Sequence, residues 1–421
     1  MNIFNEKRLI SNFLSLSGVQ AAKYILPLVT VPYLIRVLGP EKFGLIAFSQ
    51  AFIQYFVLIT DYGFNLSATR EISINRDNRT RVSEIFSSIM LIKTGFMLLS
   101  LSILCLLVFS IDRFRAERLV YLFTFGIVLG NVLFPVWFFQ GMERMKQIAM
   151  LNILSMAIFT FSIFIIIRSQ GDYIYVPLIN SIGSIIAGLI SLWIAVRKFG
   201  VSIKFPVFTA VKYQLKEGLH IFISTIAISG YTNTRIFAVG LFTSNIITGY
   251  YAIAERLMGI IQTFPLASLL QTVYPGLSNL FSENKANAII IMKRFQKLTT
   301  LTYLSGLPAV FIFAPYIVKI VSGFPYEEVI LSFRLLLIAI FFINANAFRI
   351  QFLLVCGRDD LFAKIHIIMG ITGALLSFLF TYSFSYIGTA AAIIIVEFAV
   401  LILTLRYYYN EIKGFTCRLG I

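Results

Sequence analysis

Apolar runs of about 20 residues recur along the whole 421-residue chain. A helix of that length, rising about 1.5 Å per residue, crosses a hydrocarbon core about 30 Å thick. Hydrophobic residues make up 58% of the chain and charged residues only 13%, about half the share of charge in a soluble domain. The sequence therefore predicts an all-α, polytopic membrane protein.

Twelve spans are predicted, at residues 10–37, 43–64, 84–110, 119–139, 147–168, 173–196, 217–242, 247–278, 297–322, 328–355, 362–384 and 387–409. With both termini in the cytoplasm, 22 lysines and arginines fall in cytoplasmic segments and 7 in external ones. This bias follows the positive-inside rule, so we expect cytoplasmic termini. No small-residue cleavage site follows the first apolar run, which we interpret as a retained helix and not a signal peptide.

The basic charge of the chain is explained by this topology. A net charge of +16 would suggest nucleic acid in a soluble protein, but here it belongs to cytoplasmic loops, and no nucleic acid partner is expected. The three cysteines and two histidines are scattered singly: Cys105, Cys356, Cys417, His220 and His366. They predict no disulfide framework, metal site or cofactor.

Two pairs of short motifs indicate an internal repeat. FFQGMERMKQIAM from Phe138 and LVCGRDDLFAKIH from Leu354 each place a glycine and a charged turn before a new helix. GLIAFSQ from Gly44 and GYYAIAE from Gly249 share a G-x-x-A frame. The offsets are 216 and 205 residues. We therefore expect two six-helix halves with the same orientation.

The predicted halves are an N-terminal lobe, residues 1–205, and a C-terminal lobe, residues 206–421. The basic segment from Lys198 to Lys216, which contains Pro206, is the predicted linker. Parallel repeats of this kind are typical of transporters, whose substrate site lies between the repeats. We expect the first two spans of each lobe to line a central cavity.

Lys23 is the polar residue whose position inside a predicted span most needs an explanation. It lies about 20 Å from the start of its span, too deep for its side chain to reach the interface easily. A charge at that depth costs at least about 2.5–3.5 kcal/mol. We expect a water-filled cavity around it, with a buried ion pair as the alternative. The candidate cavity residues are Gln20, Lys23, Gln50, Gln54, Tyr231, Arg235 and Arg256.

We predict different roles for the other intramembrane charges. Glu255 and Glu397 are candidate ion-coupling acids, for H⁺ or Na⁺. Because Glu255 and Arg256 are adjacent, their side chains diverge on a helix and their partners are expected on other helices. For Arg235, snorkelling to the external surface is the alternative to a cavity position. The charges expected to snorkel or pair, or to brace a helix end, are Lys93, Arg334, Arg349 and Asp61.

The deepest charges are cationic, which favours an anionic cargo. Arginine forks match phosphate oxygens and lysine acts as a point charge, so phosphate or pyrophosphate fits Lys23, Arg235 and Arg256. A carrier of cations would need an acidic lining instead.

The N-terminal part of the chain resembles a known family. VPYLIRVLGPEKFGLIAFSQAF (Val31–Phe52) and ITDYGFNLSATREIS (Ile59–Ser73) are similar to the opening of Wzx-type O-antigen and polysaccharide-unit flippases. These belong to the MOP superfamily, with the MATE transporters and lipid II flippases. WFFQGMERM from Trp137 and GYYAIAERL from Gly249 resemble further family stretches.

The resemblance implies a MATE-like fold, with two six-helix lobes forming a V around a central cavity. It implies that undecaprenyl-pyrophosphate-linked oligosaccharide moves from the inner to the outer leaflet of a bacterial inner membrane, alongside polymerase and chain-length machinery. Flipping breaks no bond, so no catalytic residue is expected. The alternative is a MATE-like drug/ion antiporter. A membrane polymerase or ligase is disfavoured, because the predicted external loops are about ten residues or fewer and too short to assemble such a site.

Overall fold

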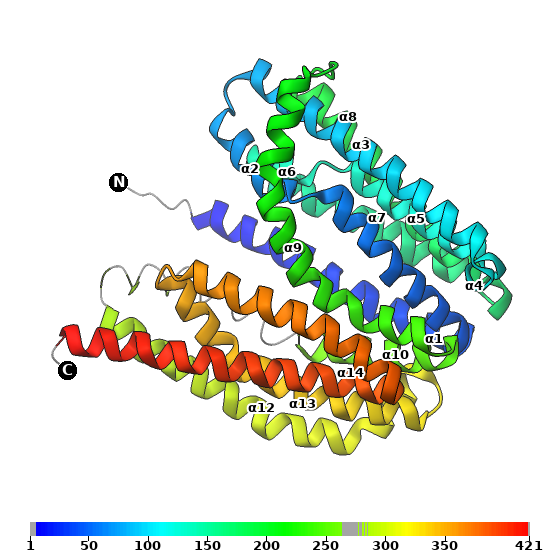
Figure 1. Ribbon diagram of the computed structural model, residues 1–421, viewed down its shortest axis with the longest axis vertical. Coiled ribbons are helices and arrows are strands. Elements are labelled where there is room, and N and C mark those ends of the chain that lie inside the picture. Colours follow the sequence, from blue (N-terminus) through cyan, green and yellow to red (C-terminus); the bar gives the residue numbers. More distant parts are fainter. Residues whose placement is uncertain (1–5, 263–276, 278–279, 282, 284, 420–421) are drawn as a thin grey trace. The chain divides into compact units, whose positions relative to one another are not determined.

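The computed structural model describes residues 6–262, 277, 280–281, 283 and 285–419, and the side chains of residues 6–25, 27, 227–231, 359 and 410–419 lie outside this description. Within the described residues every regular element is a helix (Figure 1). By their contacts the residues group into two compact units, Met1–Ile226 and Ala227–Ile421. The predicted repeat boundary at residue 205 is based on sequence motifs and not on contacts, so it stays a prediction.

Unit 1 contains nine complete helical elements and the first part of α9 among the described residues. Their bounds are α1 Glu6–Asp61, α2 Phe64–Ile74, α3 Arg79–Ser110, α4 Asp112–Ala116, α5 Arg118–Leu133, α6 Val136–Gly141, α7 Met145–Ile166, the short 3₁₀-helix η1 Gln170–Ile174, α8 Tyr175–Phe199 and α9 Phe208–Phe242. Unit 2 contains the rest of α9, α10 Asn245–Gln262, α12 Lys285–Ser322, α13 Glu327–Val355 and α14 Asp359–Leu419.

Two of the longest helices are broken where the sequence predicts gaps between spans. In α1 the break is at Gly39, whose φ of 72° and ψ of 171° leave the helical region. In α14 it is at Phe384 and Ser385, and a hydrogen bond of 2.6 Å between Thr381 and Thr389 joins the two arms across the turn. Each helix therefore supplies two predicted spans, and the predicted breaks at 38–42 and 385–386 are confirmed.

Eight helical stretches in the described residues are long and apolar enough to cross a membrane. They account for ten of the predicted spans, because the α1 and α14 stretches each contain two. The predicted spans 217–242 and 247–278 correspond to α9 and α10, which carry Arg235, Glu255 and Arg256. Residues 263–276 of the second of these lie outside the described residues.

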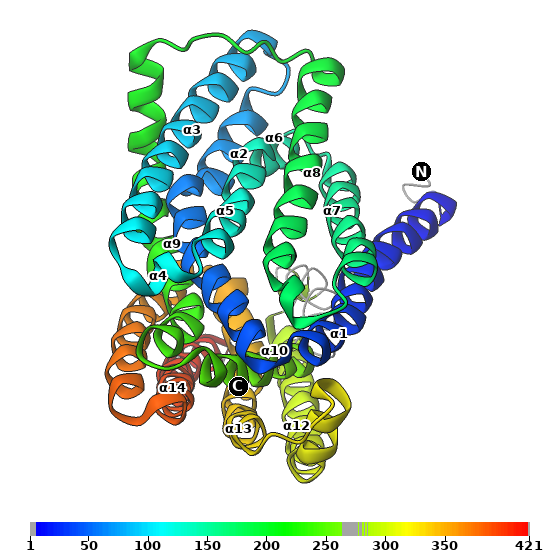
Figure 2. The same cartoon turned by 90° about the vertical axis from the view of Figure 1, so that its right-hand side faces the viewer.

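The helices of unit 1 pack closely because small residues face one another. Helices α5 and α8 lie side by side (Figures 1 and 2). A Cβ built on Gly130 would stand 2.6 Å from the Cβ of Ser184, and one on Gly188 would stand 2.9 Å from the Gly130 carbonyl oxygen. In lipid, where burial of apolar surface between helices gains little, such close backbone approach supplies the van der Waals contact that holds helices together.

The best-packed region of unit 1 lies around the short helices α2 and α6. Phe64, Ile72, Phe86, Trp137 and Phe138 are fully buried there in one cluster. Ring contacts of 5.4 Å join Phe86 to both Trp137 and Phe138. This cluster fixes the turn between α2 and α3 against α6, which positions the charged residues described below.

In unit 2, α13 packs against α10, α12 and α14, and Figure 1 shows α12, α13 and α14 side by side. Polar side chains join these helices inside the membrane, where each satisfied hydrogen bond avoids a cost of several kcal/mol. Gln296 of α12 donates to the Ala345 carbonyl of α13 at 2.8 Å. Asn346 of α13 donates to Thr404 of α14 at 3.2 Å.

The repeated turn motif is present in both units with the same hydrogen bonds. Arg144 N donates to Phe139 O at 2.8 Å, and Arg358 N donates to Leu353 O at 2.9 Å. The left-handed residue of each turn is Glu143 in unit 1, with φ 56°, and Gly357 in unit 2, with φ 72°. The structural offset is therefore 214 residues and not the 216 obtained by aligning glycines, because Gly141 precedes the turn position by two residues.

Candidate functional site

The clearest polar pair of unit 2 lies between α9 and α10. Arg235 Nη2 is 2.5 Å from Glu255 Oε1, and only 13% and 14% of these two side chains are exposed. Glu255 thus finds its partner on another helix, as expected from the divergence of adjacent side chains. At this burial the attraction between the charges is far stronger than in water.

Tyr251 lies one helical turn before Glu255, so both side chains leave α10 on the same face. The Tyr251 side chain is fully buried. Among the described residues, neither Tyr251 Oη nor Glu255 Oε2 has a hydrogen-bond partner. Buried oxygens without donors are costly. One oxygen of the Glu255 carboxylate is therefore open to a further hydrogen-bond donor.

The other predicted residues of unit 2 differ in burial and in helix. Arg256 has an exposed side chain, consistent with its pointing away from Glu255. Glu397 is half-buried in the second arm of α14. Tyr231 lies in α9, but its side chain is outside the description. Of the candidate cavity cations, Arg235 is thus the one with a defined acidic partner here.

In unit 1 the glutamines Gln50 and Gln54 lie on one face of the second arm of α1, four residues apart, and both are half-buried. In the G-x-x-A alignment Gln50 takes the position of Glu255. Gln20 and Lys23 lie in the first arm of α1, and their side chains are outside the described residues. Their placement in a cavity therefore stays a prediction.

Lys93 of α3 forms a second intramembrane ion pair, with Asp61 at the last residue of α1. The Nζ–Oδ1 distance is 2.9 Å, and Lys93 also donates to Asn131 Oδ1 of α5 at 3.0 Å. The Lys93 side chain is only 2% exposed. Of the two outcomes predicted for Lys93, snorkelling or pairing, the structure shows pairing, and Asp61 lies at the helix end as predicted. Sequence reasoning missed Asn131, which lies near the end of its span and carries no pattern of its own.

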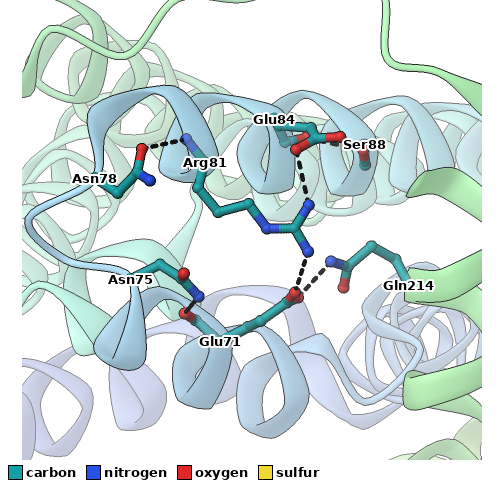
Figure 3. Close-up of polar contacts among 7 residues, drawn as sticks. All are labelled: Glu71, Asn75, Asn78, Arg81, Glu84, Ser88 and Gln214. Carbon is teal, nitrogen blue, oxygen red and sulfur yellow. Dashed lines mark hydrogen bonds and ion pairs between the residues drawn. The ribbon is translucent and has the colours of Figure 1, made fainter.

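A third charged cluster, around Arg81, joins α2, α3 and α9 (Figure 3). Arg81 is 3.1 Å from Glu71 and 2.8 Å from Glu84, and Glu71 also accepts a hydrogen bond from the buried amide of Gln214. A pocket of about 200 Å³ opens beside it, lined by Arg81, Glu84, Ile85, Ser88, Thr209, Ala210, Tyr213 and Gln214. Only the Arg81–Glu84 spacing of three residues is a sequence signal, so this cluster was not predicted.

Next to this cluster the start of α9 packs on the end of α1. The Tyr62 ring stacks on the Phe222 ring at 4.6 Å, and a Cβ on Gly218 would stand 2.9 Å from the Tyr62 carbonyl oxygen. Since α9 also carries Arg235, one helix holds both the Gln214 contact and the Glu255 pair.

Comparison with known families assigns the chain to one of them. Residues 9–281 match the profile of the family described as "Polysaccharide biosynthesis protein". This chain belongs to that family. The match covers well over half of the chain and includes the resemblance motifs from Val31 to Leu257.

This chain has full-length relatives that are described as transporters. It is 30% identical over 410 residues to a protein of Escherichia coli (strain K12) described as a "putative O-antigen transporter", covering 97% of this chain and 98% of the relative. A Shigella dysenteriae protein with the same description is 26% identical over 402 residues, covering 94% of this chain and 98% of that relative. The predicted resemblance is thereby confirmed, and these relatives are described as transporters and not as enzymes.

Solved structures show the same fold. Lipid II flippase MurJ, in an inward closed conformation, matches with a TM-score of 0.75 and 15% identity, covering 93% of this chain and 86% of MurJ. An inward-facing MATE family multidrug transporter of the MOP superfamily matches with a TM-score of 0.66 and 14% identity, covering 92% and 94%. The chain is therefore an all-α, multi-pass membrane protein with the fold of these transporters.

Proposed function

We propose that this protein flips undecaprenyl-pyrophosphate-linked oligosaccharide, an O-antigen or capsule repeat unit, from the cytoplasmic to the external leaflet of a bacterial inner membrane. The observation that carries this proposal is the full-length similarity to proteins described as O-antigen transporters. A flippase shares the fold. The cationic residues of the predicted cavity suit a pyrophosphate head group.

The proposed orientation has both termini in the cytoplasm. It rests on the distribution of basic residues, 22 against 7, because the charge bias of short loops sets the orientation of a polytopic protein. In this orientation the charged cluster around Arg81 lies at the cytoplasmic ends of α2, α3 and α9.

The proposed head-group site combines cations and polar groups from the two predicted lobes, residues 1–205 and 206–421. Its members are Gln20, Lys23, Gln50, Gln54, Tyr231, Arg235 and Arg256. Lys23 supplies a positive charge without a carboxylate nearby in its own sequence segment, and the amides supply donors to phosphate oxygens. Binding of one anion by both lobes would favour one arrangement over the other, which is the requirement for alternating access.

Glu255 is proposed to couple a proton to this binding. While Glu255 is ionised it neutralises Arg235 at 2.5 Å. Protonation of Glu255 removes that partner, and the Arg235 guanidinium is then best satisfied by a pyrophosphate oxygen. Release of the substrate would restore the pair and expel the proton. Glu397 is the second candidate acid for coupling to H⁺ or Na⁺.

The test is a flipping assay in proteoliposomes with a fluorescent undecaprenyl-pyrophosphate oligosaccharide, scored by the fraction that becomes accessible in the other leaflet. The protein should accelerate its appearance many-fold over protein-free vesicles. A matched assay with a cationic dye and an imposed proton gradient tests the MATE-like antiporter alternative. Dye transport without lipid flipping would overturn the proposal.

A further inference from the structure

The linker between α8 and α9 presents large apolar side chains to its surroundings in a fixed conformation. Phe205 is 96% exposed and Phe208 78% exposed, the highest values among the exposed large apolar residues of the described chain. Ile203 and Val207 are exposed as well. Four such side chains within six residues would be a liability in water, where they favour aggregation or a partner.

Hydrogen bonds to α3 hold this linker in place. Ser83 Oγ accepts from Ser202 N at 3.1 Å, and Ser87 Oγ accepts from Lys204 N at 3.1 Å while donating to Ser202 O at 3.3 Å. These bonds fix the backbone on both sides of Ile203 and next to Phe205, so both side chains are exposed in a held segment. The exposure of Ile203 and Phe205 is thus imposed by the fold.

The same hydrogen bonds indicate the depth of the linker relative to the membrane. Ser83 and Ser87 lie about 6 and 12 Å along α3 from its first residue, Arg79, within the first turns of a membrane-crossing helix. The preceding helix α8 is 25 residues long, about 37 Å, and so ends just beyond a 30 Å hydrocarbon core. Figure 2 shows the linker crossing the end of unit 1 from α8 to α9. These helix lengths are those expected of a linker at the level of the lipid head groups.

Lysines lie before, among and after the apolar residues in the sequence. Lys198, Lys204, Lys212 and Lys216 are all exposed, and Glu217 is the one acidic residue between 197 and 217. An apolar centre with a basic rim is the composition of segments that lie in an anionic lipid interface.

We propose that the linker surface, Ile203, Lys204, Phe205, Val207, Phe208 and Lys212, docks on the anionic phospholipid of the adjacent leaflet. The rings enter the boundary between head groups and acyl chains, and the lysines contact lipid phosphates. A soluble protein partner would need the surface to stand clear of the bilayer, which the anchoring to the first turns of α3 opposes. The proposal is independent of the transported substrate.

Tryptophan quenching in lipid nanodiscs tests this. Trp193 is exposed on α8 and Trp137 is buried, so Trp193→Phe removes the exposed background and Phe205→Trp adds the probe. Brominated phosphatidylglycerol or brominated phosphatidylcholine is added at the same low mole fraction to an unbrominated bilayer. Each lysine near an anionic surface gives about fivefold enrichment, the equivalent of about 1 kcal/mol. We therefore expect the anionic lipid to quench the introduced tryptophan at least about fivefold more strongly.

The matched variants remove three charges each. Lys204, Lys212 and Lys216→Gln should abolish the preference for the anionic lipid, whereas Lys293, Arg294 and Lys297→Gln, three exposed cations of α12, should leave it unchanged. If the first variant fails to fold, raising the salt concentration on the parent protein should reduce the preference in the same way. No quenching by either lipid, or equal quenching by both, would overturn the proposal.

Discussion

Glu143 and Gly357 occupy the same left-handed position in two turns with matching hydrogen bonds, 214 residues apart. The glycine that precedes Glu143, Gly141, has a different task. A Cβ on Gly141 would stand 2.6 Å from Ile72 side-chain atoms, whereas nothing lies within 4 Å of a Cβ on Gly357. One glycine is required by packing and the other by its backbone conformation.

This difference predicts two distinct mutational patterns. Gly357→Ala should destabilise by about 1–2 kcal/mol through its left-handed φ, and Gly357→Asn should recover much of that loss because asparagine tolerates this conformation. Gly141→Ala should cost about 1–3 kcal/mol by overpacking, and the larger Gly141→Asn should cost more. Thermal unfolding of the four variants in one detergent measures this, and a rescue of Gly141 by asparagine would contradict it.

The Lys93–Asp61 pair should matter more for folding than for transport. Lys93→Met leaves the Asp61 carboxylate without its cation and should destabilise by about 3 kcal/mol. Lys93→Met with Asp61→Asn removes both charges and should recover most of that loss. Abundance in membranes and unfolding in detergent are the measurements. Equal losses for the single and double variants would show that packing of the lysine stem, and not the charge pair, dominates.

Glu255→Gln should uncouple flipping from the proton gradient. The amide preserves the shape of the carboxyl group and imitates its protonated form, so the variant should still bind substrate, at an abundance lowered by the loss of the charge that pairs with Arg235. Flipping in proteoliposomes should lose its dependence on an imposed pH gradient. Glu397→Gln, on a different helix, tests the second candidate acid in the same assay. A Glu255→Gln protein with unaltered gradient dependence would remove Glu255 from the coupling role.

Glu143 forms an exposed ion pair with Arg76, 2.9 Å away, so the stability of the turn should depend on pH. The hydrogen bond and the charge of Arg76 lower the pKa of Glu143 below its ordinary value. The pair therefore stabilises the folded turn above the ordinary carboxyl pKa, and its contribution disappears as pH falls through the lowered value. Carboxyl carbon NMR of labelled protein should show the Glu143 pKa rising to its ordinary value in Arg76→Ala. An unchanged titration would refute the assignment.

Lys23→Ala should abolish surface polysaccharide in a flippase-null strain while leaving near-normal protein in the membrane. The reason is that removal of an unpaired charge from a deep position does not harm folding. Lys23→Arg should retain partial activity, since the charge survives with an altered reach. Surface polysaccharide and an immunoblot are scored together. Full activity of Lys23→Ala would end the head-group role, and loss of the protein band would favour the buried ion pair.

Sequence reasoning located the spans because their length and hydropathy are set by the membrane, and Gly39 and Ser385 fall in the predicted gaps. It found the polar face with Arg235 but not its pairing with Glu255, since helix periodicity gives directions within one helix and not the partner across an interface. The Glu71–Gln214 contact joins residues 143 positions apart, and no local pattern predicts such a contact.

The last consequence concerns α9. Its first part, up to Ile226, belongs by contacts to unit 1, although the predicted repeat boundary precedes the whole helix. With the predicted boundary at residue 205, the second repeat would supply a segment that packs in unit 1, as in an exchanged element between protomers. Two separate genes cut at residue 205 would make one polypeptide with an uncovered Glu71 and Tyr62 and another with an orphaned Gln214 and Phe222. Because separation would break these contacts, there is a physical reason for the two halves to stay in a single gene.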